Sequence, residues 1–130
     1  MGASKDKGTR WETGIVRYWL REFGIKAWRK APAGVEDEGD IGTNTFPDWT
    51  IQAKDQKTWR LRPWWRQVTA QRVLARTPFG VLFVKQVGTT DPAEGWAIQT
   101  IEQWTQRELR HNGIEARLKD AALWPRNPDT

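Results

Sequence analysis

The segment "GDIGTNTFPDWTIQAKDQ", residues 39–56, decides the fold of this 130-residue chain. From Trp49 to Lys54 the side chains alternate between apolar and polar, a pattern that predicts a β-strand. The preceding "TNTFPD" is rich in turn residues, so this strand should pair with a strand that opens at Asp40 and Ile41. We therefore expect an antiparallel hairpin in which Asp40 lies opposite Gln52 or Lys54.

The alternation assigns side chains to two faces of this strand. The core face should carry Trp49, Ile51 and Ala53, and the other face should carry Asp48, Thr50, Gln52 and Lys54. With Asp40 in register, a carboxylate, an amide oxygen and an ammonium group then meet at one place. Phosphodiester hydrolysis needs a divalent cation at the phosphate and positive charge that stabilises the transition state.

We infer a hydrolytic site from these three side chains. Asp40 would be the carboxylate ligand of the metal, with the Gln52 amide oxygen and the Ala53 backbone carbonyl as neutral ligands. Lys54 would orient the attacking water and stabilise negative charge. Hard oxygen ligands favour Mg²⁺, with Mn²⁺ as the other candidate. Taken singly, Asp40 is better explained as a turn residue and Lys54 as an ordinary lysine of an exposed strand.

The rest of the chain predicts helices and strands in the order αβββαβ, followed by a further strand and helix. We expect helices over 9–23, 63–76 and 101–110 and strands over 25–31, 80–88 and 96–99. Thr100 and Gln103 match a capping box at the start of the last helix. This order favours an α/β fold, a single three-layer α/β/α domain with a mixed central sheet. The domain should span residues 9–110, between a flexible N-terminus at 1–8 and a partly irregular tail at 111–130.

Positive charge is concentrated in one part of the sequence. The net charge is +5, and between Lys54 and Arg76 there are seven basic residues against one acid, Asp55. Such a block predicts binding to a DNA backbone, although a solvated helix face is the alternative. The expected DNA-binding residues are Lys57, Arg60, Arg62, Arg66 and Arg72. Three of the ten tryptophans, Trp59, Trp64 and Trp65, fall inside this block, where they can stack on unpaired bases or pack on sugars.

Composition excludes several other classes of site and location. The absence of cysteine rules out a disulfide framework, a thiolate metal site and a cysteine nucleophile. The sequence "MGASKDKGTR" lacks the apolar stretch of a signal peptide, and no run of about 18 apolar residues predicts a membrane span. We therefore expect a soluble, cytoplasmic protein with no membrane partner.

Several motifs together resemble the PD-(D/E)XK nuclease superfamily, in particular Holliday junction resolvases of the phage and archaeal type. They are "KGTRWETGIVRYWLREFGI", "AGVEDEGDI", "IQAKDQ", a following helix with Gln67, and "WAIQTIEQW". Their order and spacing are similar to those of the family over residues 7–108. The resemblance implies a restriction-endonuclease-like fold and a Mg²⁺-dependent endonuclease that cuts branched DNA. It also implies a homodimer, since paired cuts need two sites, and a phage protein that acts in a bacterial host.

The resemblance also implies which residues form the site. The metal ligands fall on Glu12, Asp40 and Gln52, and Lys54 and Gln67 complete the catalytic set. Glu12 has an alternative, because Thr9 and Glu12 match a helix capping box. Asp37 is a possible additional ligand or only a turn acid.

The chain departs from the family at Gln52, where the pattern has glutamate or aspartate. The substitution removes a negative charge and should weaken metal binding. Two alternative functions follow, because the chain departs from the family pattern at Gln52 and because one fold can host several activities. One is a catalytically silent DNA-binding module, and the other is an exonuclease or repair nuclease of the same superfamily.

Overall fold

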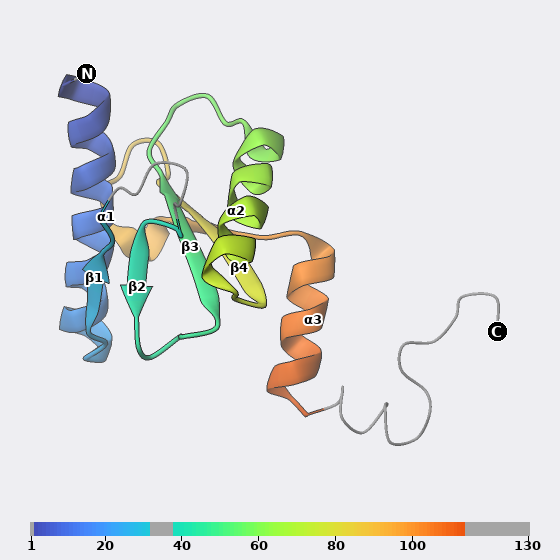
Figure 1. The fold of residues 1–130 in the computed structure, drawn as a ribbon. Coiled ribbons are helices and arrows are strands. Elements are labelled where there is room, and N and C mark those ends of the chain that lie inside the picture. Colours follow the sequence, from blue (N-terminus) through green and yellow to red (C-terminus); the bar gives the residue numbers. More distant parts are fainter. Residues whose placement is uncertain (1, 32–37, 114–130) are drawn as a thin grey trace. The chain divides into compact units, whose positions relative to one another are not determined.

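The computed structural model describes residues 2–31 and 38–113 of the chain. The chain divides into two compact units, residues 1–99 and residues 100–130, where the sequence suggested one domain over 9–110. The first unit is an α/β fold with a five-stranded mixed sheet (Figure 1). The second unit contains one described helix, α3 (Ile101–His111).

The sheet follows chain order, β1-β2-β3-β4-β5. Its strands are β1 (Ala27–Arg29), β2 (Ile41–Thr43), β3 (Trp49–Lys54), β4 (Phe79–Val84) and β5 (Trp96–Ile98). Only β3 and β4 run parallel, since the helix α2 (Leu61–Ala75) carries the chain back between them. The other neighbours are antiparallel. The predicted hairpin and the bounds of its second strand are thus confirmed.

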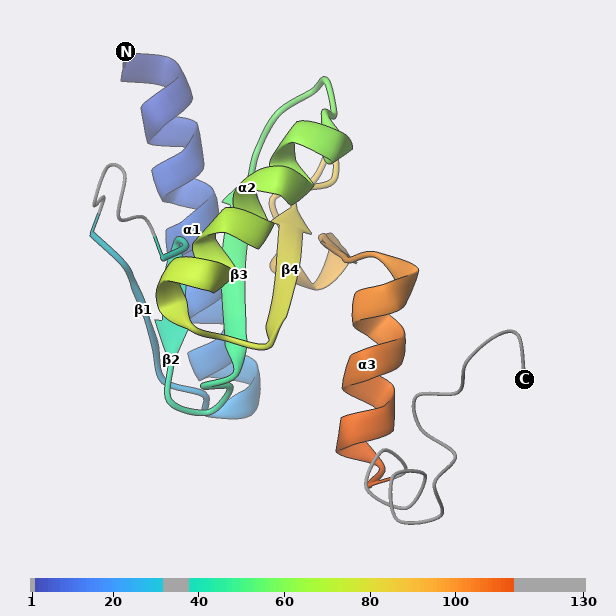
Figure 2. The same cartoon turned by 45° about the vertical axis from the view of Figure 1, so that its right-hand side comes forward.

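Helices cover both faces of the sheet in the first unit. The helix α1 (Gly2–Phe23) buries Trp11 and Ile15 against the face that carries Ile51. On the other face, α2 buries Trp64 and Val68 together with residues of β4. Figure 2 shows α2 in front of the strands and α1 behind them. The central strands are therefore covered on both sides.

The packing of helices on both faces of the sheet corrects one expectation for β3, that only the face with Trp49, Ile51 and Ala53 is in the core. Its second face is not open to solvent, because Thr50 is fully buried and Gln52 is 4% exposed. The Thr50 hydroxyl lies 2.6 Å from the hydroxyl of Thr77, at the end of the α2 connection. Of the β3 residues on this face, only Lys54, the last residue of the strand, is partly exposed. Solvent therefore reaches this face only toward the end of the strand.

The start of the first helix is a second correction. We expected residues 1–8 to be flexible and the helix to begin near Thr9, but α1 begins at Gly2. Thr9 and Glu12 therefore lie within the helix and do not cap its start. Lys5 and Lys7 are good helix formers, and the polar first turns have no apolar period that would have revealed them.

The last helix follows its predicted capping signal. Thr100 is the N-cap of α3, and its hydroxyl accepts a hydrogen bond from the Gln103 backbone amide at 3.2 Å. A short 3-10 turn, η2 (Pro92–Glu94), precedes β5 and was not predicted. Of the predicted tail, residues 114–130 lie outside the described part of the chain. No helix among the described residues has the length and apolar character of a membrane span.

Candidate active site

A cavity of about 600 Å³ lies where α1, the β2–β3 hairpin and the end of β3 come together. Four of the five predicted catalytic side chains line it: Glu12, Asp40, Gln52 and Lys54. These residues come from three elements separated by up to 42 positions in sequence. The structure thus brings together the residues that the motif selected, around a space large enough for a phosphate group and a hydrated ion.

The hairpin fixes the position of Asp40. Ile41 pairs with Ile51, so one further step along the antiparallel ladder sets Asp40 opposite Gln52, as predicted. The Asp40 amide donates to the Ile51 carbonyl at 2.8 Å. Its carboxylate Oδ2 accepts a hydrogen bond from the Ala53 amide, also at 2.8 Å. These two bonds hold the carboxylate at the cavity wall.

Gly39 gives the chain the conformation that it needs before Asp40. Its φ is +107°, a value that other residues rarely adopt, and a Cβ here would lie 3.0 Å from the Ile51 carbonyl oxygen. The backbone therefore turns tightly into β2 at this point. Only glycine satisfies both conditions without strain.

Replacing Gly39 with alanine should lower the free energy of unfolding by about 2–3 kcal/mol, because backbone strain and a close contact add. Gly88 offers a matched control, since it also has a positive φ of 91° but nothing within 4 Å of an added Cβ. Gly88→Ala should cost about 1 kcal/mol. Urea unfolding measures both, and equal losses would show that the close approach at Gly39 has no effect.

Glu12 reaches the cavity from α1. Its neighbour Trp11 is 4% exposed and donates its indole N–H to the Phe83 carbonyl at 3.0 Å, which fixes this turn of the helix on the sheet. The Glu12 carboxylate accepts a hydrogen bond from Arg29 Nε at 3.2 Å, and Arg29 also donates to the Thr9 hydroxyl at 3.3 Å. Glu12 is therefore paired with a cation of β1 and is not a helix cap.

Gln52 is the most unusual group in the cavity. It is 4% exposed, and its side-chain oxygen Oε1 is buried with no hydrogen-bond partner among the described residues. An unsatisfied buried amide oxygen costs about 1–3 kcal/mol. A polar residue that lowers stability at a cavity wall suggests a ligand that supplies the missing partner.

Lys54 is held by α2. Its ammonium donates to Gln67 Oε1 at 2.9 Å and lies 5.8 Å from the centre of the Trp64 ring. Gln67, the fifth predicted residue, does not line the cavity but contacts the lysine that does. Trp64 is 5% exposed in the core, so the prediction that it can stack on bases is wrong, and burial beneath α2 is the reason.

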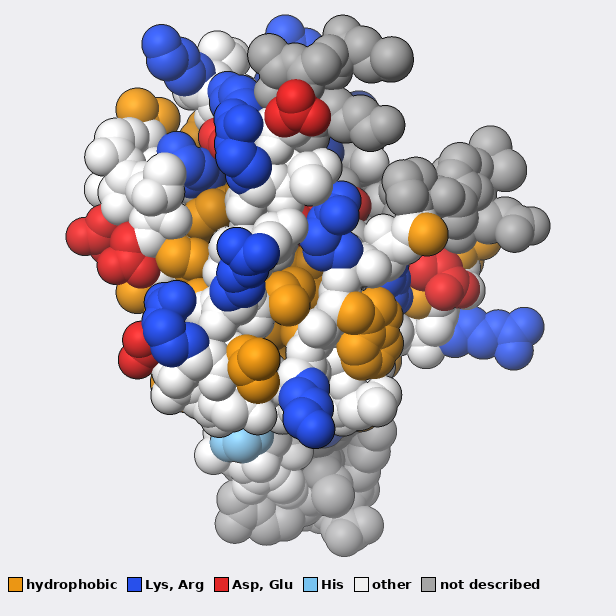
Figure 3. Space-filling model, turned by 90° about the vertical axis from the view of Figure 1, so that its left-hand side faces the viewer, with side chains coloured by type: hydrophobic (Ala, Val, Ile, Leu, Met, Phe, Trp, Pro, Cys, Tyr) orange, Lys and Arg blue, Asp and Glu red, His pale blue; other side chains and the backbone are white. Residues whose placement is uncertain are grey.

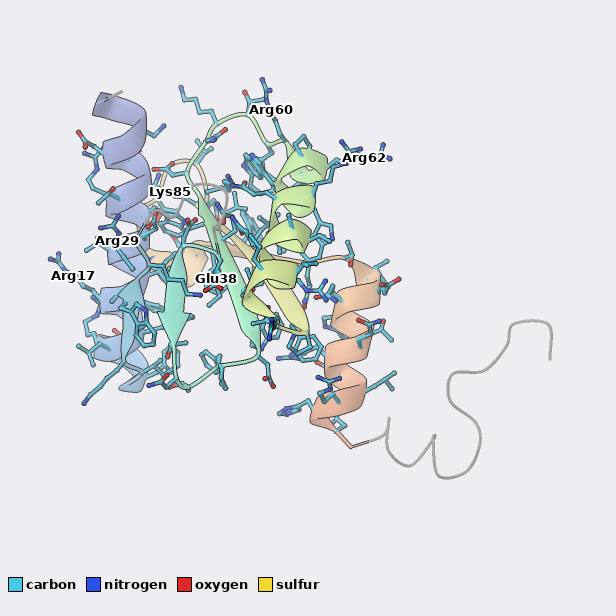
Figure 4. The ribbon with its side chains drawn as sticks, in the orientation of Figure 1. Arg17, Arg29, Glu38, Arg60, Arg62 and Lys85 are labelled. Atoms are coloured by element: carbon cyan, nitrogen blue, oxygen red, sulfur yellow. The ribbon has the colours of Figure 1, made fainter. Side chains whose placement is uncertain are left out.

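Charges around the cavity are nearly balanced. Its cations are Lys7, Arg29, Lys30 and Lys54, and its carboxylates are Glu12, Asp40 and Asp55, which leaves one positive charge in excess (four minus three). Asp55 also lies 4.0 Å from the ammonium of Lys85. Figure 4 shows Arg29 near α1 and Lys85 beyond the end of β4. The cavity can therefore attract a phosphate group as well as a cation.

Arg29, Lys7 and Lys30 were not predicted as cavity residues. The alternation of "IKAWRKA" indicated a strand, but the sequence does not reveal the pairing of Arg29 with Ile41. That pairing turns Arg29 to the same face as Ile41, toward α1. The Lys7 position depends on the early start of α1, which the sequence pattern also did not indicate.

The oxygen donors of the cavity fit a hard cation. Two carboxylates, an amide oxygen and the Ala53 carbonyl are the ligand types that Mg²⁺ accepts. Within residues 2–31 and 38–113, no three His, Cys, Asp or Glu side chains cluster as a metal site by themselves. A cation here would therefore depend on the unpartnered Gln52 Oε1. Asp37, the possible additional ligand, lies outside the described residues.

The predicted DNA-binding residues divide into two groups. Four are exposed and precede or begin α2: Lys57, Arg60, Arg62 and Arg66. Arg72 differs, because it is half-buried and donates to the Pro78 carbonyl at 2.6 Å. A structural role in closing the α2–β4 turn accounts for Arg72.

Positive charge is not confined to this block. Figure 3 shows the side of the molecule with α1 and β1, where Lys and Arg side chains are spread between hydrophobic ones.

Comparisons of the chain with family models, with curated proteins and with solved structures found no match.

Proposed function

We propose that this chain is a metal-dependent endonuclease that hydrolyses phosphodiester bonds in branched DNA, with a restriction-endonuclease-like arrangement of the PD-(D/E)XK type. The observation that carries the proposal is the convergence of Glu12, Asp40, Gln52 and Lys54 on one cavity. These side chains come from separate elements, and each is of the type that the chemistry requires. The exposed basic residues before and in α2 support DNA as the substrate.

The chain's own residues have distinct roles in this proposal. Asp40, Gln52 Oε1 and Glu12 would hold Mg²⁺, whose chemistry is to polarise the phosphate and activate a water. Lys54 contributes a fixed ammonium that can donate to the phosphate oxygens and stabilise developing negative charge. Gln67 positions that ammonium through the 2.9 Å hydrogen bond. Arg29 neutralises Glu12 while no cation is bound.

Junction cleavage tests this function. The purified protein is incubated with a labelled four-way junction, with and without Mg²⁺, beside linear duplex and single strands of the same sequence. We expect Mg²⁺-dependent cuts in the junction, and less cutting of the linear forms. Cutting without Mg²⁺, or no cutting of any DNA, would refute the proposal, and preference for DNA ends would indicate an exonuclease or repair nuclease.

The proposal includes a homodimer. Symmetrical cuts in a four-way junction require two active sites related by a twofold axis. Sedimentation of the protein with and without a junction measures the number of chains per DNA. A complex with one chain per junction that still makes paired cuts would contradict the dimer.

A second candidate is a DNA-binding module without catalytic activity. Two observations favour it: Gln52 removes a carboxylate from the site, and Arg29 already compensates Glu12. Such a module would bind DNA in a salt-dependent way and cut nothing with any divalent cation. The same junction assay, with binding measured in parallel, separates the two.

A further inference from the structure

We propose that Trp59 is a stacking platform for an unpaired nucleobase, so that the cavity receives a strand at a branch point or single-stranded segment. This inference rests on the proposed function and specifies its substrate. Trp59 lies in the loop between β3 and α2, directly after the residues of the cavity. Four independent features of this loop support the assignment.

The first feature is the exposure of the Trp59 side chain. It is 38% exposed, whereas Trp64 is 5% exposed and Trp65 is half-buried in the same segment. Among the described residues, Trp59 forms no aromatic pair or cation–π contact. Because most of the residue is nonetheless covered, little ordering entropy remains to be lost when a base stacks on it.

The second feature is the charge of the surrounding chain. From Gln56 to Thr90 there is no aspartate or glutamate, and there are seven basic residues. Lys57, Arg60 and Arg62 beside Trp59 are exposed. In Figure 4, Arg60 lies on the loop and Arg62 extends outward from the start of α2. An aromatic side chain among exposed cations is the combination that binds single strands.

The third feature is the short path from the cavity to Trp59. Gln56 lines the cavity, and Trp59 follows three residues later, so their Cα atoms are at most about 10 Å apart. Stacked nucleotides of a duplex are about 3.4 Å apart along the helix axis, and an unpaired strand can extend further per nucleotide. A base on Trp59 would therefore belong to a nucleotide within about three positions of the phosphate in the cavity.

The fourth feature is the location of the loop in the fold. The loop and the N-terminal half of α1 lie at the same end of the sheet (Figures 1 and 2). Glu12 and Lys7 of α1 line the cavity at this end. A strand whose phosphate enters the cavity thus passes the loop that carries Trp59.

The test compares the binding of forked and fully paired DNA. Anisotropy of a labelled fork with a single-stranded arm, and of a duplex of equal length, is measured in EDTA so that no DNA is cut. Trp59→Ala should weaken fork binding by about 5-fold to 100-fold and change duplex binding by less than about twofold. Trp59→Phe should keep most of the affinity for the fork, because it retains an aromatic face.

Trp96→Ala is the matched control. Trp96 is 48% exposed, but its nearest charged neighbours in sequence are Asp91 and Glu94. The Trp96→Ala variant should bind both DNAs with the affinity of the wild type. Thermal unfolding checks that each variant folds. Equal losses on fork and duplex, no loss at all, or a wild type that does not distinguish the two DNAs overturns the inference. A wild type that prefers the fork through Trp59 but never cuts with Mg²⁺ supports the inference and refutes the proposed nuclease.

Discussion

Replacing Lys54 with alanine should slow single-turnover cleavage of a four-way junction by about a hundredfold to a thousandfold. This loss corresponds to about 3–4 kcal/mol of transition-state stabilisation. The reason is the way the ammonium is fixed: it donates to Gln67 at 2.9 Å and lies over the Trp64 ring. A group that is already oriented loses little free energy in reorganisation when negative charge develops.

Lys57→Ala is the control for the loss of a positive charge. Lys57 is three residues beyond Lys54 and is exposed in the loop. Its removal should weaken DNA binding slightly and leave the rate at saturating protein within about threefold of the wild type. If Lys54→Ala and Lys57→Ala lower the saturated rate equally, Lys54 acts only as a surface charge and the assigned role is wrong.

Replacing Gln52 with glutamate has the second largest expected effect. A third carboxylate among the proposed metal ligands, beside Glu12 and Asp40, should lower the Mg²⁺ concentration needed for half-maximal activity by at least about tenfold. Without metal, the variant should lose at least about 2 kcal/mol of stability, because Gln52 is 4% exposed and a charge would be buried opposite Asp40. Saturating Mg²⁺ should restore that stability, since a ligand that binds the folded state stabilises it.

Thermal unfolding with and without Mg²⁺ measures the metal effect independently of cleavage. Gln71→Glu is the control, because Gln71 is 2% exposed in α2 and does not line the cavity. It should lose stability that Mg²⁺ does not restore. If Mg²⁺ stabilises neither variant, the cavity does not hold the cation through residue 52.

The same Gln52→Glu variant distinguishes the two candidate functions. A wild type that cuts the junction, with only a modest gain in the variant, indicates a site built around glutamine. A silent wild type and an active variant indicate a DNA-binding module that has lost catalysis through this one substitution. If neither the wild type nor the Gln52→Glu variant cuts the junction, the remaining candidate is a DNA-binding module that has no nuclease site.

Local patterns predicted most of the fold. The alternation from Trp49 to Lys54 gave the bounds of β3, and the turn before it gave the hairpin. The capping box at Thr100 gave the start of α3. The start of α1 at Gly2 was missed because the sequence of the added turns is polar and has no apolar period that would predict a helix.

For the candidate site, the sequence motif predicted the residues that one hairpin brings together, but it missed contacts between distant elements. Asp40, Gln52 and Lys54 lie on one hairpin, so local register alone brings them together. Arg29 was missed because its contact with Glu12 joins a strand to a helix 17 residues away. Arg72 was assigned to DNA binding from its charge alone, and only the fold reveals its bond to Pro78.

The most direct test of the proposed site compares Asp40→Asn with Asp48→Asn in the Mg²⁺-dependent junction assay. Asparagine preserves the shape of Asp40 and can still accept the Ala53 hydrogen bond, so the change removes a charge from the cavity with little effect on the fold. Asp48 is exposed just before β3 and does not line the cavity. Single-turnover cleavage should fall by at least about a hundredfold for Asp40→Asn and stay within about twofold of the wild type for Asp48→Asn. Undiminished cleavage by Asp40→Asn would contradict the account, since the cavity would then not be where DNA is cut.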